Sequence, residues 1–335
     1  MQKLKKTCGA AMAITIGKGG KETSGIIDDD VVQPFSLEST GLRGRMVRLG
    51  PSLKQIIELH DYPLPVSYLL SEAVTLSLLL AAMLKYDGIF TLQIQAEGPI
   101  RAIITDVNAK GHIRAYAAFD SDEIAAIDHT NHQQDHNYYH LLESGYMSFT
   151  VDQGENTDRY QGIVNLTGDS LMEAVQHYFD QSEQIRTAIR MSIHPQDDQW
   201  RSGAVMVQYI PETPEQEADH DRQSERLEDW RRTTILMETC RDEELLSPNL
   251  HSADVLYRLF HEEGVRIYPP TPVKHVCRCS RERVANVLQT LSAEERKDAR
   301  DEKGEIDITC EFCGRQYFFT SQDVDALDAS ADRKN

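Results

Sequence analysis

Two short stretches decide the organisation of this chain: Cys277-Arg278-Cys279 and Cys310-Glu311-Phe312-Cys313. They form a CxC pair and a CxxC pair, with residues 280–309 between them. Four thiolates in two close-spaced pairs complete a tetrahedral zinc site, and four protein ligands leave no position for water or substrate. The spacing therefore predicts a structural zinc ion held by Cys277, Cys279, Cys310 and Cys313.

The same cysteines are suited to redox chemistry, because zinc holds each sulfur as a thiolate and the thiolate is the form that oxidants attack. Loss of the metal would remove the ion that folds the small domain. Two interpretations follow: a permanent zinc ribbon, and a switch that releases zinc on oxidation. Gly314 fits the turn of a zinc knuckle, and His275 is a further candidate ligand, although four sulfurs already fill the site.

Length, charge and cysteine use narrow the class of protein. A chain of 335 residues predicts two domains. A net charge of −19 argues against a nucleic-acid partner, which usually needs a basic face. Six cysteines, four of them at metal spacing, indicate a reducing compartment, and the first twenty residues resemble a signal peptide only weakly, so we expect a cytoplasmic protein. The most apolar stretch, Ala73–Leu84, is too short to cross a bilayer and predicts a buried core helix.

Residues 36–210 predict one α/β domain with an antiparallel sheet and packed helices. A long apolar helix is expected over 66–85, and Ser170 is expected to cap a second one. Alternating patterns predict strands that follow one another as hairpins rather than as βαβ units. The expected strands cover 90–96, 100–107, 112–119, 146–152, 159–166, 185–193 and 204–210, with a polar turn over 194–203.

The remaining segments complete an α+β fold class with a small C-terminal zinc domain built on four cysteines. Residues 1–35 predict a flexible N-terminal extension that contains Cys8. Residues 211–270 predict a charged helical linker, and such segments have low local stability and are natural moving parts. This linker contains Cys240. Residues 271–325 predict the zinc domain, which has so little core that it needs its metal to fold.

Other polar residues carry weaker signals. The stretch with His129, His132, His136 and His140 is interpreted as a solvated loop rather than a metal site. His60, Glu72 and Asp87 are interpreted as helix caps or members of polar networks, and no general acid–base pair is expected. The chain contains no GxxxxGK[ST] motif, so the sequence does not support ATP dependence.

Several stretches, together with the cysteine tail, resemble the heat-shock protein 33 family of redox-regulated holdases. The resemblance covers roughly residues 38–320. The stretches that carry it are His60-Asp61-Tyr62-Pro63, Leu69-Leu70-Ser71-Glu72-Ala73, Leu84–Gln93, Tyr160-Gln161-Gly162-Ile163-Val164 and Tyr178–Gln184. Departures from the family pattern are the N-terminal extension, the His-rich stretch, Ser71, Cys8 and Cys240.

The resemblance implies a chaperone of the stress response rather than an enzyme. Zinc on the four cysteines would keep the reduced protein inactive. Oxidation would form the disulfides Cys277–Cys279 and Cys310–Cys313, release zinc and loosen the linker. The protein would then form a homodimer and bind unfolding client proteins without ATP, with no nucleic-acid or membrane partner. Two alternatives remain: a thiol oxidoreductase that uses the CxxC pair, and a constitutive zinc-ribbon binding module.

Overall fold

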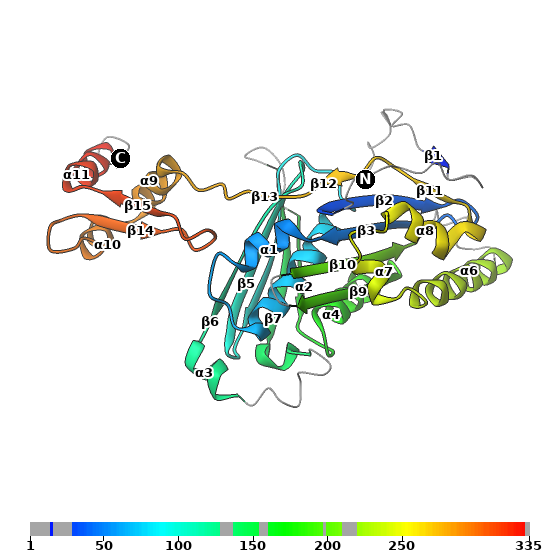
Figure 1. Ribbon diagram of the computed structural model, residues 1–335. Helices are drawn as coiled ribbons and strands as arrows, with labels where there is room; N and C mark the ends of the chain where they lie inside the picture. The colour runs from blue at the N-terminus through cyan, green and yellow to red at the C-terminus, as the bar shows by residue number, and fades with distance from the viewer. Residues whose placement is uncertain are drawn as a thin grey trace. The chain divides into compact units, whose positions relative to one another are not determined.

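The computed structural model describes residues 14–15, 29–127, 137–153, 160–196, 199–209 and 220–331. The chain divides into two compact units (Figure 1). The larger unit contains Tyr62–His275 and most of the chain before it, and the smaller unit consists of Leu59–Asp61 and the chain from Val276 onward. The two units are described separately below.

A seven-stranded antiparallel sheet forms one layer of the larger unit, in the order β1-β11-β2-β3-β10-β9, with β12 also paired to β2. The strands come from distant parts of the chain, because β11 pairs with β2 and β10 pairs with β3. Their bounds are β1 Ile14–Thr15, β2 Val31–Leu37, β3 Arg43–Leu49, β9 Thr187–Gln196, β10 Gln199–Gln208, β11 Val265–Ile267 and β12 Thr271–Pro272.

A six-stranded sheet forms a second layer, in the order β13-β6-β5-β4-β7-β8. Its strands pair antiparallel, except that β13 runs parallel to β6. Their bounds are β4 Ile89–Ala96, β5 Ile100–Asn108, β6 His112–Phe119, β7 Gly145–Asp152, β8 Tyr160–Asn165 and β13 Lys274–His275. The antiparallel hairpins that the alternating sequence predicts are thus confirmed.

Helix α2 (Leu64–Ala81) is the centre of the main core and packs against strands of both sheets. It is long and apolar enough to cross a membrane, but 89% of its apolar window is buried inside the protein. A helix that is apolar on every side is typical of a protein core, so the predicted core helix is confirmed. The short elements of this part of the unit are α1 Pro51–Ile57, α3 Ser121–Ala126, η1 Tyr139–Leu142, α4 Leu171–Tyr178 and η2 Phe179–Glu183.

Further helices of the larger unit cover the other face of the seven-stranded sheet (Figure 1). Alternate residues of one strand face opposite sides of a sheet, and accordingly Met206 belongs to the main core while Val205 and Val207 contact this second apolar cluster. Phe35 of β2 stacks on Phe260 with ring centroids 5.8 Å apart. The covering elements are α6 His220–Glu238, α7 Asp242–Leu246, α8 Ser252–Phe260 and η3 His261–Glu263.

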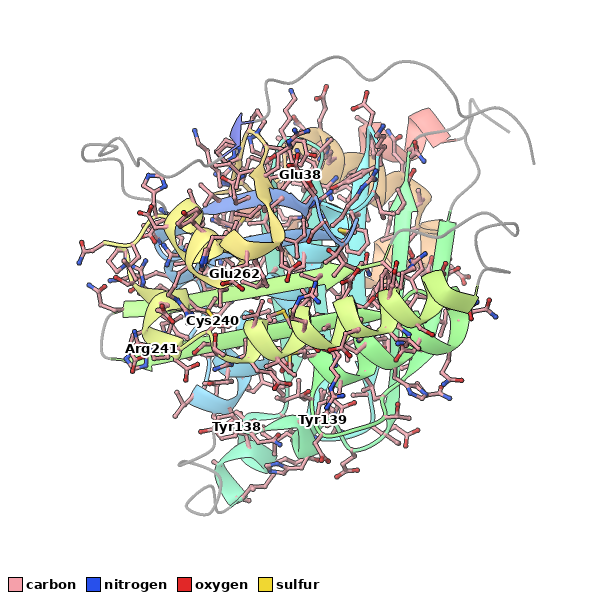
Figure 2. All side chains as sticks on the ribbon, turned by 90° about the vertical axis from the view of Figure 1, so that its right-hand side faces the viewer. Glu38, Tyr138, Tyr139, Cys240, Arg241 and Glu262 are labelled. Atoms are coloured by element: carbon pink, nitrogen blue, oxygen red, sulfur yellow. The ribbon has the colours of Figure 1, made fainter. Side chains whose placement is uncertain are left out.

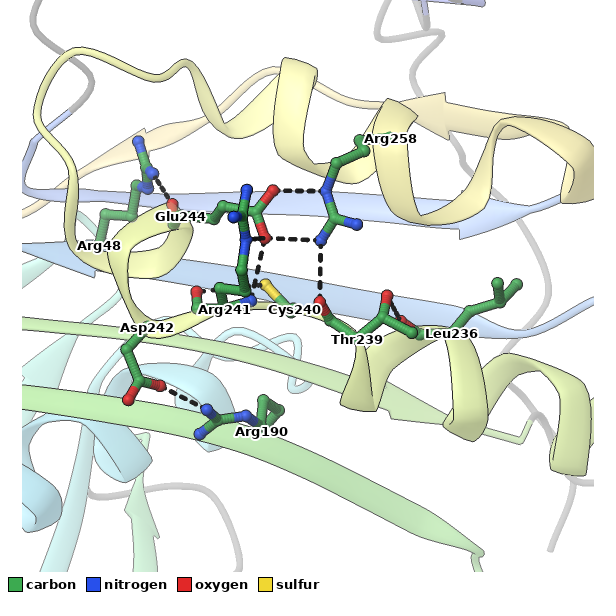
Figure 3. A network of polar contacts seen from close by, with 9 residues as sticks. All are labelled: Arg48, Arg190, Leu236, Thr239, Cys240, Arg241, Asp242, Glu244 and Arg258. Carbon is green, nitrogen blue, oxygen red and sulfur yellow. Dashed lines mark hydrogen bonds and ion pairs between the residues drawn. The ribbon is translucent and has the colours of Figure 1, made fainter.

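Arginines tie these helices to the sheet (Figure 3). The buried Arg48 of β3 donates to the backbone carbonyls of Glu244 and Leu250. The Glu244 carboxylate accepts a hydrogen bond from Arg258 at 2.8 Å, which joins α7 to α8. Cys240 lies inside this network and is only 2% exposed.

The structure corrects one local prediction. A polar turn was expected over residues 194–203, but β9 extends to Gln196 and β10 begins at Gln199, with His194 paired to Arg201. The polar side chains of this region are tolerated because they have partners inside the unit. Ser202 lies 2.7 Å from the Thr75 hydroxyl, and Arg201 donates to the Leu246 carbonyl at 2.6 Å.

The segment boundaries of the structure also differ from those expected. The boundary expected at residue 35 falls inside β2. The segment expected as a linker over 211–270 contributes β11 to the seven-stranded sheet, because Val265 is buried there. The second unit begins at Val276 rather than at 271, since β12 and β13 still pair in the larger unit. His129, His132, His136 and Cys8 lie outside the described residues.

The smaller unit contains one β-hairpin and three helices among its described residues. Its core is a small cluster of buried side chains, with Leu288, Ile306 and Phe319 at its centre. Arg281 lies over the Phe319 ring at 4.3 Å and pairs with Asp323 at 2.9 Å. The elements are α9 Arg281–Thr290, α10 Ala293–Asp298, β14 Ile306–Thr309, β15 Gln316–Phe319 and α11 Ser321–Ala331.

Candidate metal centre

The first cysteine pair lies immediately before helix α9. Ser280 follows Cys279, and its hydroxyl accepts a hydrogen bond from the backbone N–H of Arg283 at 3.2 Å. A serine in this position caps a helix and fixes where the helix begins. Cys279 itself packs against the small apolar core of the unit, so its sulfur is held at a defined position.

The second pair lies in the turn of the β14–β15 hairpin. The backbone N–H groups of Cys313 and Gly314 donate to the Cys310 carbonyl at 3.2 and 2.8 Å, and the Cys310 N–H donates to the Arg315 carbonyl at 2.9 Å. Gly314 has φ +66°, a conformation that side-chain-bearing residues rarely adopt. This tight turn brings the Cys310 and Cys313 sulfurs into one cluster with those of Cys277 and Cys279.

The structure brings all four cysteines together, with their sulfur atoms within 4.8 Å of one another. The Sγ atoms of Cys277 and Cys310 are 3.8 Å apart, and those of Cys279 and Cys313 are 3.4 Å apart. Four sulfurs bound to zinc at about 2.3 Å would lie about 3.8 Å apart at the corners of a tetrahedron. The four residues therefore fit a zinc ion and could hold it without a further ligand.

The electrostatics of the cluster also favour a cation. Burial acts to raise the pKa of the Cys277 thiol, but hydrogen bonds from the Cys279 backbone and the other thiols outweigh burial and lower this pKa to about 7. Burial raises the pKa of Cys310, and burial together with the neighbouring cysteines raises the pKa of Cys313 to about 12. Like charges this close oppose one another's ionisation, so four thiolates need a bound positive ion.

Tyr317 is a site residue that the sequence pattern did not single out. Its hydroxyl donates a hydrogen bond to the Cys279 sulfur at 3.1 Å. Such outer contacts orient metal ligands and tune how tightly the metal is held. The strand alternation contained the signal, because Tyr317 and Phe319 are buried on β15 while Phe318 between them is 61% exposed.

Two other candidates lie elsewhere. His275 belongs to β13 of the larger unit, and the ligand group found among the described residues consists of the four cysteines. Cys240 follows α6 in the larger unit (Figure 3). Glu72, expected as a cap or network residue, accepts a hydrogen bond from the Met172 N–H at 3.0 Å near the start of α4, which confirms that expectation.

The fold and the cysteine cluster define an α+β protein with a small module suited to a structural metal ion. The family model described as "Hsp33 protein" matches residues 30–320. The chain belongs to this family.

Its relatives include "33 kDa chaperonin" proteins from several bacteria. The one from Caulobacter vibrioides is 36% identical over 293 residues, covering 86% of this chain and 94% of the relative. The one from Proteus mirabilis is 34% identical, covering 89% and 96%. The crystal structure of the 33 kDa chaperonin from Thermotoga maritima has the same fold, with a TM-score of 0.74 at 21% identity, and covers 90% of this chain and 99% of that one.

Proposed function

We propose that this protein is a cytoplasmic, redox-regulated holdase chaperone that works without ATP and is not an enzyme. The observation that carries the proposal is the cluster of four cysteine sulfurs within 4.8 Å of one another in a chain of the Hsp33 family. Such a cluster holds a metal when reduced and offers oxidisable thiols when the metal leaves.

In the reduced state Cys277, Cys279, Cys310 and Cys313 would hold one zinc ion. The bound ion would keep the sulfurs as thiolates and join the first cysteine pair to the β14–β15 turn. This link matters because the unit has a small apolar core. Structural zinc contributes on the order of ten kcal/mol to the folding of such modules, which is more than the core could replace.

Oxidation would pair each cysteine with its sequence neighbour. The Cys277 and Cys279 thiolates would lose two electrons in forming one S–S bond, while one hydrogen peroxide takes up these electrons and two protons from solvent and is reduced to two waters. Cys310 and Cys313 would consume a second peroxide in the same way. Disulfide sulfurs are poor metal ligands because the thiolate is the ligand form, so zinc would leave and the unit would lose its fold.

Client binding would follow from movement of the segment over 211–270. Its helices cover apolar side chains of the seven-stranded sheet, including Phe35, Met46 and Val205. Charged residues dominate this segment between Glu212 and Glu244, where twelve acidic side chains accompany five basic ones. Release of these helices would expose the apolar face to unfolding proteins and to a second copy of the chain, giving the oxidised homodimer.

The test follows zinc and holdase activity in the same sample. Zinc-loaded protein is treated with peroxide at mild heat, zinc is detected with a chromogenic chelator, and aggregation of a thermally unfolding client is recorded by light scattering. We expect zinc release and aggregation suppression to rise together and to reverse with a thiol reductant. Zinc release without holdase activity would show that the cysteine cluster has only a structural role, and would refute the proposal.

Matched variants locate the switch. Cys277→Ser with Cys279→Ser should abolish zinc binding and uncouple activity from peroxide, whereas Cys240→Ser, which removes a thiol outside the cluster, should switch like the parent. A double variant that binds zinc and switches normally contradicts the site assignment. Catalytic turnover in a disulfide-reduction assay would instead indicate an oxidoreductase, and salt-sensitive DNA or RNA binding would indicate a zinc-ribbon module.

A further inference from the structure

A cavity of about 470 Å³ with polar and apolar lining lies in the larger unit. Its wall combines carboxylates with tyrosine rings, and the elements that contribute include α2, η1, β9 and α7. Figure 2 labels two of these tyrosines, Tyr138 and Tyr139, side by side and well away from Glu38. The cavity is of the size that small-molecule sites usually have.

Glu72 of α2 supplies a buried carboxylate to this wall, with only 8% of the residue exposed. It accepts a hydrogen bond from the Met172 N–H at 3.0 Å. Among the described residues it forms no ion pair with a lysine or arginine. Burial raises the pKa of Glu72 to about 7, against the lowering effect of backbone N–H groups of Met172 and Leu171. Buried carboxylates are normally paired with a cation, whereas the described residues of this wall provide Glu72 with no cationic partner.

Tyr139 supplies a second unsatisfied group. The residue is 9% exposed, and its hydroxyl oxygen is buried without a hydrogen-bond partner among the described residues. Glu72 and Asp169, which also line the cavity, are among the acidic groups that interact electrostatically with this hydroxyl. A tyrosine hydroxyl both donates and accepts, and a buried one without a partner costs stability. A ligand in the cavity would satisfy it.

The charge balance of the wall favours a cation over an anion. Arg190 is the arginine of the wall, and its guanidinium is paired with Asp242. Glu72 and Asp169 remain as acidic groups, with His194 as the further titratable base. The rings of Tyr68 and Tyr138 pack edge to face with centroids 5.7 Å apart, and tyrosine faces attract organic cations.

We infer that this cavity binds a small organic cation with an ammonium group. Glu72 supplies the counter-charge, the Tyr139 hydroxyl supplies a hydrogen bond, and the neighbouring tyrosine rings receive the apolar surface of the ligand. Glu72 and Tyr139 lie outside the segment 211–270, so the inference does not require the redox switch, and Asp242 and Leu246 of α7 complete the cavity wall in the zinc-loaded state.

The probe is choline, and its uncharged isostere 3,3-dimethylbutan-1-ol is the matched ligand control. Both are titrated by calorimetry into the full, zinc-loaded chain. We expect saturable one-to-one binding of choline and at least tenfold weaker binding of the isostere. Equal affinity for the two ligands would show that the cavity recognises only their apolar groups and not the charge, which would overturn the inference. The absence of saturable choline binding at millimolar concentration would overturn it as well.

Two variants place the ligand in the cavity. Glu72→Gln keeps an oxygen that can accept the Met172 N–H but removes the charge, and should weaken choline binding at least tenfold. Tyr139→Phe should weaken it severalfold. The matched controls are Glu225→Gln on the exposed surface of α6 and Tyr146→Phe on β7, which should bind like the parent. If both cavity variants also bind like the parent while tryptophan fluorescence shows them folded, choline binds elsewhere and the inference is wrong.

Discussion

Replacing Glu72 with glutamine should stabilise the protein at neutral and alkaline pH when no cation is added. Burial raises the pKa of this carboxyl from 4.5 to about 7. Each pKa unit corresponds to about 1.4 kcal/mol, so the ionised carboxylate costs the native state roughly 3 kcal/mol above pH 7. The Glu72→Gln variant avoids this cost, and its amide oxygen can still accept the N–H of Met172.

The sign and the pH window follow from proton linkage. Between about pH 4.5 and 7 the native state binds the Glu72 proton more tightly than the unfolded state does. The contribution of Glu72 is therefore fully present below about pH 4.5 and is lost as the pH rises through 7. The stability advantage of Glu72→Gln should reach roughly 3 kcal/mol at pH 8 and fall to about 1 kcal/mol or less at pH 5.

Urea unfolding followed by tryptophan fluorescence measures this difference. The two tryptophans, Trp200 and Trp230, both belong to the larger unit, so the signal reports on the unit that contains Glu72. Free energies of unfolding come from linear extrapolation at pH 5 and pH 8, with the exposed Glu225→Gln variant as the control for loss of one charge. A Glu72→Gln variant that is less stable than the parent at pH 8, or whose difference does not change with pH, would refute the reasoning.

Three further changes probe the proposed switch. Glu263→Gln weakens the contact of Glu263 with Arg232, whose Nη2 donates to it at 3.0 Å. We expect the attachment of α6 to lose about 1–3 kcal/mol of stability, which should speed trypsin cleavage within α6. An unchanged cleavage rate would contradict this anchoring role. Tyr317→Phe removes the hydrogen bond to the Cys279 sulfur, so zinc affinity should fall about tenfold or more in a chelator competition, whereas unaltered affinity would show that this contact does not tune the site. In Gly314→Ala the alanine must adopt φ +66°, although its added methyl group would meet no atom within 4 Å. This backbone conformation costs an alanine about 1–2 kcal/mol and should lower the temperature at which zinc is released. An equal release temperature would argue against strain at this turn.

The sequence predicts best where the signal is local. The two cysteine pairs lie on short segments whose geometry depends on neighbours a few residues away, such as the cap at Ser280 and the turn at Gly314. The apolar run in α2 likewise identifies the core helix, because a helix buried on every side needs apolar residues throughout. The clustering of the four cysteines and the core helix could therefore be predicted from single stretches of chain.

Long-range pairing explains what the sequence did not predict. β11 is only three residues long and is paired with β2, which lies more than two hundred residues earlier. No local pattern distinguishes such a strand from a linker. Polar residues of the β9–β10 hairpin favoured a turn, and long-range contacts such as those of Ser202 with Thr75 and of Arg201 with Leu246 show why they can remain inside a sheet. The sequence likewise did not predict the environment of the Glu72 carboxylate, which forms no ion pair among the described residues, because that environment combines α2, η1 and α4.

The short segment over residues 271–275, here called the strap, precedes Cys277 and limits how the proposed switch can work. β12 pairs with β2 of one sheet and β13 with β6 of the other, and Val273 between them is 3% exposed. Each of these strands has only two residues, so few hydrogen bonds hold the strap, among them the Lys274 N–H to the Gly111 carbonyl at 3.1 Å.

If the chain becomes disordered from Cys277 toward the N-terminus, the strap is therefore the first segment affected, before β11 and α8. The strap has little pairing to lose, whereas α8 buries Leu256, Leu259 and Phe260 against the sheet. Burying one such side chain contributes about 1.5–3 kcal/mol, so loss of the zinc module would free the strap more readily than the helices. Oxidation alone would then free the strap but leave α8 packed on the sheet. A second stress that weakens apolar packing, such as heat, would be required to expose the apolar face of the sheet to client proteins.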